Sequence, residues 1–230
     1  MEKLVYLIDN IQFREQKLRD LILKGASITD FDKGYISLPK VNQFLDPTVY
    51  KLATDLIRYN FKDKQFDLVA GVPNSATALG ACLMLTMGIP LAPGRKENIY
   101  PKSWRSPAVI NGNTESFTTG EDVSGFVFNL NAEQIPNRKY KILLVEDFIA
   151  SGTTLSLIAK RLLDEGHDVS IATMVAKLFQ GGVDKIKMST ADNEKGRTGI
   201  CAYYAVGIDR MDSNTNGSDG IILAKPHYKE

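Results

Sequence analysis

Cysteine and histidine are scarce in this chain, whose 230 residues include two of each. Two cysteines are too few for a disulfide framework, and Cys82 lies in an apolar helical run, where we expect a reduced thiol. His167 and His227 fall in a helix-end turn and in the tail, so neither is well placed to act as a general base. The composition therefore excludes a disulfide-stabilised scaffold and gives no support to histidine-based catalysis.

Long apolar runs and an excess of charge of one sign are also absent. The sequence has no stretch of 18 or more apolar residues, so we expect no membrane span. The first ten residues are interrupted by charge and lack the apolar core of a signal peptide, which favours a cytoplasmic protein. The net charge of +1 and the pI of 7.7 give no reason to expect binding to nucleic acid or to an acidic membrane.

Apolar strands alternate with amphipathic helices along the chain, and 43% of the residues are hydrophobic, enough for a sizeable core. Helices are predicted over residues 9–24, 47–59, 76–87 and 154–165. Strands are predicted over residues 66–72, 89–92, 123–130, 142–145, 169–177 and 199–208. This order predicts an α/β fold with a mostly parallel central sheet flanked by helices.

The segment from Ile142 to Leu155 carries the strongest functional signal. Its apolar start, residues 142–145, predicts a buried strand, and Glu146 and Asp147 follow where we expect that strand to end. The small Ser/Gly/Thr turn at 150–154 then opens a helix, and backbone N–H groups at such a helix start bind anions. Adjacent carboxylates repel one another unless they bind something, and they can accept hydrogen bonds from vicinal hydroxyls. A phosphate with a diol nearby fits this pattern, which indicates a ribose 5-phosphate.

A second anion site is expected at the same edge of the sheet. The stretch Gly71–Ala76 is another strand end, turn and helix start, with Asn74 or Ser75 as the N-cap. Arg95 and Lys96 follow the short strand at 89–92 and supply two cations. Because ligands bind beyond the carboxyl ends of parallel strands, two such turns suit a ligand with phosphates at both ends.

An apolar strand, two acidic residues and a small Gly/Ser/Thr loop in this order resemble the phosphoribosyl pyrophosphate (PRPP) motif of type I phosphoribosyltransferases. The resemblance covers about residues 18–190 and is closest to xanthine (purine) phosphoribosyltransferases. It implies the type I phosphoribosyltransferase fold. We expect a single domain over residues 1–230, with a hood at about 25–45 plus part of the C-terminal tail, and a core at about 46–208.

The resemblance also implies roles for the residues of the motifs. Glu146 and Asp147 would be the catalytic pair that holds the ribose hydroxyls. The 5′-phosphate would be bound by Ala150, Ser151, Gly152, Thr153 and Thr154. The pyrophosphate would be bound by Pro73, Asn74, Ser75, Arg95 and Lys96. Mg²⁺ would accompany PRPP, held mainly by the substrate, with Asp147 as the candidate protein ligand.

Two further segments resemble the purine members of the family. Ser116, Phe117 and Thr118 lie in a long polar segment, residues 97–121, and would form a flexible loop that closes over the reaction centre and excludes water. The pattern Lys-x-Phe-Gln-x-Gly at 177–182 implies that Lys177 meets an oxygen of the base and that Phe179 stacks near its ring. A cation at that position favours an oxo-purine over an amino-purine.

The hood segment completes the expected base site, because Tyr35 and Asn42 fall at base-contacting positions. Tyr35 departs from the aliphatic residue found in xanthine enzymes, and the 150–154 loop is closer to the loops of other purine and pyrimidine members. The resemblance implies transfer of a 5-phosphoribosyl group from PRPP to a purine, with a xanthine-like 6-oxopurine favoured, in purine salvage by a homodimer. An adenine- or orotate-type enzyme and a non-catalytic PRPP-sensing regulator are the alternatives. A P-loop kinase is disfavoured because the sequence has no Gly-x-x-x-x-Gly-Lys-Ser/Thr motif.

Overall fold

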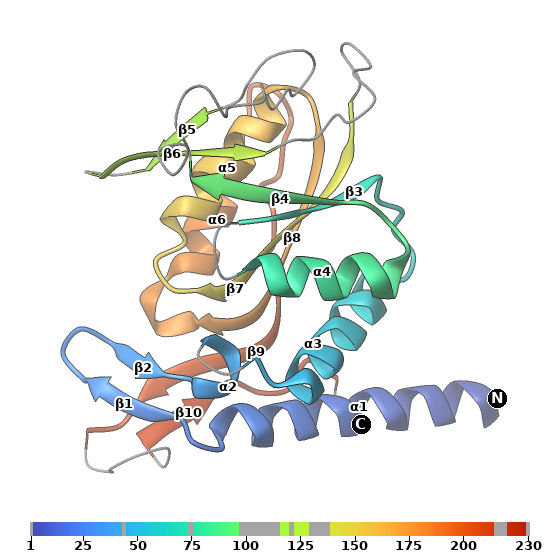
Figure 1. Cartoon of the computed structure of the whole chain (residues 1–230), viewed down its shortest axis with the longest axis vertical. Coiled ribbons are helices and arrows are strands. Elements are labelled where there is room, and N and C mark those ends of the chain that lie inside the picture. The colour runs from blue at the N-terminus through green and yellow to red at the C-terminus, as the bar shows by residue number, and fades with distance from the viewer. Residues whose placement is uncertain are drawn as a thin grey trace.

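Helices cover both faces of a central sheet in the computed structural model of this chain (Figure 1). The structure describes residues 2–42, 45–72, 76–96, 116–119, 122–128, 139–213 and 220–228. Within these ranges, only the backbone is described for residues 2–9, 42, 95–96, 116–119 and 122–128.

The sheet has eight strands in the described residues, in the order β10-β9-β8-β7-β3-β4-β6-β5. Five neighbouring strands run parallel: β9 (Tyr203–Met211), β8 (Asp168–Lys177), β7 (Lys141–Ile149), β3 (Leu68–Gly71) and β4 (Leu91–Lys96). Antiparallel strands complete the two edges: β10 (Ile221–Leu223), β6 (Asp122–Phe128) and β5 (Ser116–Thr119). The prediction of a mostly parallel sheet flanked by helices is confirmed.

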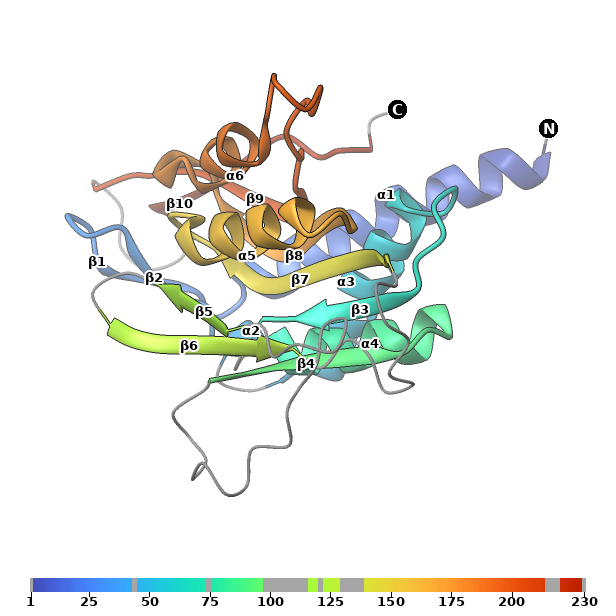
Figure 2. The same ribbon diagram turned by 90° about the horizontal axis from the view of Figure 1, so that it is seen from above.

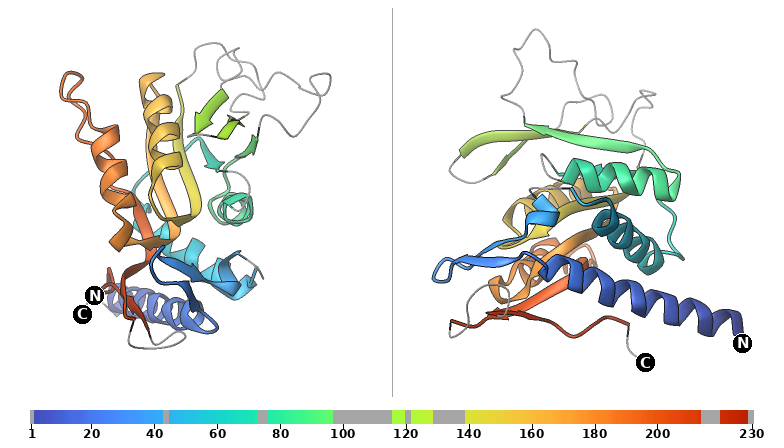
Figure 3. Two further views of the ribbon diagram at one scale, coloured as in Figure 1. Left: turned by 90° about the vertical axis from the view of Figure 1, so that its left-hand side faces the viewer. Right: turned by 60° about the horizontal axis from the view of Figure 1, so that its bottom comes forward.

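Two apolar clusters, one on each face of the sheet, hold the layers together. On one face, α1 (Glu2–Leu23), α3 (Pro47–Asn60) and α4 (Ala76–Met87) cover the sheet through a cluster that includes Leu56, Leu79 and Leu143 of β7. On the other face, α5 (Thr153–Asp164) and α6 (Gly182–Thr190) pack through Leu144, Ile158 and Ile186. The left view of Figure 3 shows α5 and α6 on one side of the strands, with α3 and α4 on the other. Alternate residues of β7 thus point to opposite faces, as a strand buried on both faces requires.

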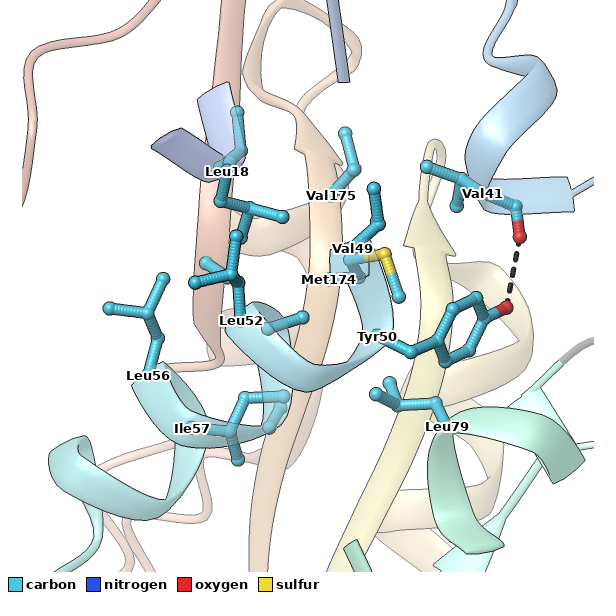
Figure 4. Packing of buried hydrophobic residues seen from close by; sticks show 14 of the residues in the cluster. Leu18, Val41, Val49, Tyr50, Leu52, Leu56, Ile57, Leu79, Met174 and Val175 are labelled. Atoms are coloured by element: carbon cyan, nitrogen blue, oxygen red, sulfur yellow. Dashed lines mark hydrogen bonds between the residues drawn. The ribbon is translucent and has the colours of Figure 1, made fainter. Parts of the chain in front are cut away.

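Helix α3 illustrates how local sequence fixes an element. Asp46 caps it by accepting hydrogen bonds from the backbone N–H groups of Thr48 and Val49, and Pro47 occupies the first turn, as predicted. Its buried face packs into the core, where the Tyr50 hydroxyl donates a 2.9 Å hydrogen bond to the Val41 carbonyl (Figure 4). That bond ties α3 to α2 (Pro39–Asn42), a short helix within the segment predicted as the hood.

A small hairpin lies in the segment predicted as the hood. Strands β1 (Ser27–Asp30) and β2 (Tyr35–Ser37) pair antiparallel, apart from the main sheet. Figures 1 and 2 place this hairpin at one end of the molecule, close to β10. The division of the chain into hood and core stays a prediction.

The C-terminal segment is held against the N-terminal helix. Arg19 of α1 donates a hydrogen bond to the Ala224 carbonyl, at 2.6 Å. Glu15, which is only 1% exposed, accepts hydrogen bonds from the backbone N–H groups of His227 and Tyr228, at 2.8 and 3.1 Å. A buried carboxylate with two backbone donors stabilises this contact, because neither donor is left unpaired.

The ends of several elements differ from the prediction. Helix α1 begins at Glu2 rather than at residue 9, since the apolar spacing of Leu4, Ile8 and Ile11 continues the helical pattern toward the N-terminus. Helix α6 was not predicted; Gly181 caps it and Gly182 is its first residue, and glycine is a poor helix former. Cys82 is a half-buried free thiol in α4, whereas the other free cysteine, Cys201, is exposed.

Two differences concern predicted site residues. Arg95 and Lys96 lie within β4, paired with β6, rather than after a strand that ends at residue 92. Ser116–Thr119 forms strand β5, antiparallel to β6, instead of part of a polar loop. Both predictions missed the β4-β6-β5 ladder, because strand pairing supplies backbone hydrogen bonds that neither segment signals alone. In the described part of the chain, no helix is long and apolar enough to cross a membrane.

Candidate active site

A cavity of about 160 Å³ lies where β7 meets α5. It is lined by Glu146, Phe148, Ile149, the turn 150–154 and Leu155. The carboxylate predicted to hold a ribose and the turn predicted to hold its phosphate therefore face the same space. Helix α5 begins at Thr153, so its first N–H groups, which have no partner within the helix, lie at the cavity wall.

Gly152 gives the turn its shape. Its φ of +68° is in the left-handed region, and its carbonyl accepts hydrogen bonds from the backbone N–H and the hydroxyl of Ser156, at 2.9 and 2.7 Å. A Cβ on Gly152 would overlap the carbonyl of Gly182, and a Cβ on Gly182 would lie 2.7 Å from the nitrogen of Gly152. Only glycine satisfies both the backbone conformation and the close packing of α6 on the turn.

Strand β7 extends to Ile149, so Glu146 and Asp147 lie inside the strand and not beyond its end as predicted. The strand continues because its ladder with β8 runs to the pairing of Ile149 with Ala176. One Glu146 oxygen accepts a 3.3 Å hydrogen bond from the backbone N–H of Asp147. Burial, followed by a hydrogen bond to the Asp147 carboxyl and its charge, raises the pKa of Glu146 well above the ordinary value.

Asp147 is 4% exposed and lies near α3. Burial first, and then the charge of Asp147, raises the pKa of the Tyr50 phenol on α3 to about 12. Glu146 is consequently the carboxylate that lines the cavity, and Asp147 lies behind it against the core. Asp147 as a metal ligand stays a prediction.

The turn after β3 starts beside the acidic pair. Gly71 pairs with Val145 in the parallel ladder, and the N–H of Val72 donates to the Val145 carbonyl at 3.0 Å. The segment predicted to bind pyrophosphate thus leaves the sheet next to Glu146. Its predicted ligands, Pro73, Asn74 and Ser75, lie outside the described residues.

Lys177 at the end of β8 is buried, and its ammonium donates a 2.8 Å hydrogen bond to the carbonyl of Gly34 in the hood turn. The same ammonium lies 4.8 Å from the ring centre of Phe148 and 5.9 Å from that of Tyr35. Burial lowers the pKa of Lys177. The structure therefore brings two predicted base-site residues, Lys177 and Tyr35, together. The Lys177 ammonium is hydrogen-bonded to the hood.

Phe148 is the site residue that the sequence interpretation missed. It lines the cavity beside Glu146 and also lies under the Lys177 ammonium, so it connects the phosphate turn with the hood. Its position in the PRPP motif, two residues after Glu146 on the same strand, was the available signal.

Phe179 lies elsewhere. It belongs to a short 3₁₀ turn, η3 (Leu178–Gln180), and lines a separate cavity of about 350 Å³ with the hood turn and Arg210 of β9. The two cavities share no lining residue. The structure thus does not bring Phe179 to the cavity that Glu146 lines.

The remaining predicted residues are described in backbone alone, so their contacts stay predictions: Asn42 at the end of α2, Arg95 and Lys96 in β4, and Ser116, Phe117 and Thr118 in β5. Of the two histidines, His167 is buried and accepts a 3.1 Å hydrogen bond from the N–H of Tyr140, and His227 packs on the rings of Tyr203 and Tyr204. Neither lines the cavity beside Glu146.

Solved structures with similar folds are phosphoribosyltransferases. The adenine phosphoribosyltransferase of Rhodothermus marinus superposes with a TM-score of 0.60 at 15% identity, covering 86% of this chain and 99% of that one. The Trypanosoma brucei adenine phosphoribosyltransferase, solved with AMP, pyrophosphate and ribose-5-phosphate, gives a TM-score of 0.60 at 14% identity over 81% of this chain and 79% of that one. The chain therefore has the type I phosphoribosyltransferase fold, as predicted.

Proteins with similar sequences are phosphoribosyltransferases as well. An adenine phosphoribosyltransferase of Shewanella piezotolerans is 29% identical over 169 residues, which cover 73% of this chain and 86% of the relative. One from Actinobacillus pleuropneumoniae is 28% identical over 171 residues, or 73% and 89% of the two chains. No family model matches the chain.

Fold and relatives together define the class of protein: the chain is an enzyme of the phosphoribosyltransferase class. Within that class, the proteins it resembles are named adenine phosphoribosyltransferases. The predicted closeness to xanthine phosphoribosyltransferases finds no support among them.

Proposed function

We propose that this enzyme transfers the 5-phosphoribosyl group of PRPP to a ring nitrogen of adenine and releases pyrophosphate. The observation that carries the proposal is the shared cavity of Glu146 and the 150–154 turn at the carboxyl end of β7. The names of the sequence relatives support adenine as the base.

In this proposal, the 150–154 turn binds the 5′-phosphate through backbone N–H groups and hydroxyls at the start of α5. Glu146, which lines the cavity, accepts hydrogen bonds from the ribose hydroxyls, and the negative charge of Glu146 and of Asp147 behind it favours the cationic character of the ribosyl group in the transition state. No histidine serves as a base, so positioning and electrostatics supply most of the acceleration. The pyrophosphate binds to the turn at 73–75 and to Arg95 and Lys96.

The described side chains at this site supply only a small part of the ligands that Mg²⁺ needs. Within the described residues, no group of three or more His, Cys, Asp and Glu side chains could hold a metal ion. The carboxylate oxygens of Glu146 are hard ligands of the kind Mg²⁺ takes, but PRPP would have to supply most of the coordination. When bound, Mg²⁺ neutralises charge on the departing pyrophosphate. Glu146 would lose its proton more readily as it meets a metal or a diol, since both favour its charged form.

The contact of Lys177 with the hood bears on the choice of base. Its ammonium already donates to the Gly34 carbonyl, so it holds the hood turn against β8. The exocyclic amino group of adenine is a poor acceptor for an ammonium, so Lys177 does not recognise that group. A 6-oxopurine is the second candidate, because Lys177 has three donors and lies near the rings of Phe148 and Tyr35, where a base could stack.

The test is pyrophosphate release from PRPP and Mg²⁺ with adenine, hypoxanthine, guanine, xanthine and orotate assayed in parallel. We expect turnover with adenine, abolished by Glu146→Gln and retained by Glu194→Gln, a matched change of an exposed carboxylate. Turnover with an oxo-purine instead would select the second candidate. PRPP binding without turnover would indicate the regulator, and failure to bind PRPP would refute the proposal. Gel filtration with light scattering would test the proposed homodimer.

A further inference from the structure

The 5′-phosphate cavity needs a cation that its own lining does not supply. Among its lining residues, the turn 150–154 and its neighbours are neutral, and Glu146 is the charged one. A phosphate monoester carries a charge of about −1.5 to −2 at neutral pH, so a cavity with a carboxylate in its wall repels it. Backbone N–H groups offset part of this repulsion.

Lys185 of α6 lies within reach of that cavity. Its ammonium donates a 2.7 Å hydrogen bond to the hydroxyl of Thr153, which lines the cavity and lies 3.2 Å from the hydroxyl of Ser151. One ammonium and two hydroxyls thus gather at the start of α5. Thr153 is 32 residues away in sequence, so the contact depends on how α6 packs against the turn.

The packing of α6 against the 150–154 turn fixes the distance between Lys185 and that turn. Gly182, the first residue of α6, lies so close to the turn that a Cβ on it would overlap the Ala150 carbonyl. Lys185 sits one turn later, where its N–H donates to the Gly181 carbonyl at 2.9 Å. The start of α6, with its partial positive charge, is therefore held against the phosphate turn, and the lysine stem only has to span the remaining gap.

The partner of Lys185 is a neutral hydroxyl rather than a carboxylate. In the ranges that the structure describes, Lys185 forms no ion pair with an acidic side chain. Ordering an exposed lysine costs up to about 2 kcal/mol of side-chain entropy, which a single bond to a hydroxyl barely offsets. An anion at the same position would turn this contact into a charge-assisted one.

We infer that Lys185 is a phosphate-binding residue of this enzyme, whose ammonium pairs with the 5′-phosphate of PRPP and of the nucleotide product. This inference rests on the proposed function. Because the 5′-phosphate stays bound and unchanged through the reaction, Lys185 acts equally on substrate and transition state. It lies outside the PRPP motif and reaches the site only through the fold.

The test compares Lys185→Met with Lys187→Met, a change of another exposed lysine on the same helix. Binding of ribose 5-phosphate and of PRPP is measured by titration calorimetry. We expect Lys185→Met to weaken both by roughly 5- to 30-fold, as loss of a partly screened charge-assisted bond should, and to raise the KM for PRPP with kcat and the KM for the base unchanged. Lys187→Met should match the wild type, and Lys185→Arg should restore most of the affinity.

Equal binding by Lys185→Met and Lys187→Met, with a wild type that binds PRPP, would overturn the inference and leave the proposed function intact. An equal rise in the KM for the base would also overturn it, since the effect would not be confined to phosphate. A wild type that binds neither PRPP nor ribose 5-phosphate would instead refute the proposed function. Thermal melting of the three variants checks that the exposed substitutions leave the fold unchanged.

Discussion

Replacing Lys177 by methionine tests whether this residue holds the hood or selects the base. Methionine keeps the length of the apolar stem and removes the ammonium, so the 2.8 Å hydrogen bond to the Gly34 carbonyl is lost while the packing on Phe148 remains. The buried Gly34 carbonyl then lacks its strong donor. The variant therefore weakens the docking of the hood turn on β8.

The magnitude follows from two opposing terms. A hydrogen bond from a charged donor contributes about 1.5–3 kcal/mol, but removing a buried ammonium also recovers part of its desolvation cost, which is evident in the lowered pKa of Lys177. The net cost to hood docking should be about 1–2 kcal/mol, which corresponds to a roughly 5- to 30-fold rise in the KM for the base. We expect kcat to change little, because Lys177 lies outside the cavity beside Glu146.

Initial rates with adenine and with hypoxanthine distinguish the two roles. If Lys177 holds the hood, both KM values rise by a similar factor and the preference between the bases stays the same. If Lys177 donates a hydrogen bond to an exocyclic oxygen of the base, the KM for hypoxanthine rises more than the KM for adenine, and the preference between the two bases shifts by about tenfold or more. An unchanged KM for both bases would refute the reasoning. Lys33→Met, an exposed lysine in the same hood turn, is the matched control.

Three further predictions concern the site and the C-terminal segment. Glu146→Gln should abolish activity and should stabilise the protein more at high pH than at low pH. The folded wild type keeps a proton on this raised-pKa carboxyl that the unfolded chain releases, so wild-type stability falls as pH rises above the ordinary glutamate pKa. Denaturant unfolding of both proteins at pH 5 and pH 8 measures the difference. Gly152→Ala should cost about 2–4 kcal/mol of unfolding free energy and weaken ribose 5-phosphate binding. The alanine would have to adopt a left-handed backbone conformation, and its Cβ would overlap the Gly182 carbonyl. Glu15→Ala should cost about 2–4 kcal/mol and expose the C-terminal segment to protease, because two buried N–H groups lose their acceptor.

Each of these has a control and a result that would contradict it. Gly196 has a φ of +67° with nothing within 4 Å of an added Cβ, so Gly196→Ala isolates the backbone cost; an equal loss for Gly152→Ala would show that α6 does not press on the turn. Glu194→Ala is the surface control for Glu15→Ala, and equal melting temperatures would remove the proposed role of Glu15. If the gain in unfolding free energy from Glu146→Gln became smaller as pH rises, it would contradict the raised pKa of Glu146.

Sequence patterns anticipated the elements whose signals are local. Residues 76–87 form α4 as predicted, and Asp46 and Pro47 start α3, because capping and periodicity act within one or two turns. The order of strand, acidic pair and small loop likewise located the cavity beside Glu146, since parallel strands bring their carboxyl ends to one edge.

Signals that depend on distant partners were not readable from the sequence. The apolar run stops at Val145, yet β7 continues to Ile149 because β8 supplies its hydrogen-bond partners. Likewise, the ladder between β5 and β6 turned an expected loop into a strand. Strand length and edge pairing depend on a neighbour that the segment itself does not encode.

The sequence by itself determined the α/β class and the chain order of a buried strand, an acidic pair and a small turn at 150–154, but it put the acidic pair beyond the strand rather than inside it. Tertiary structure alone decided that Glu146 lines the cavity while Asp147 is buried outside its lining, and that Phe179 lines a different cavity. It also joined Lys177 to the hood across 143 residues and Lys185 to the phosphate turn across 32. Local motifs specify which groups a chain offers, but whether a charged side chain meets substrate, backbone or core depends on packing between elements far apart in sequence.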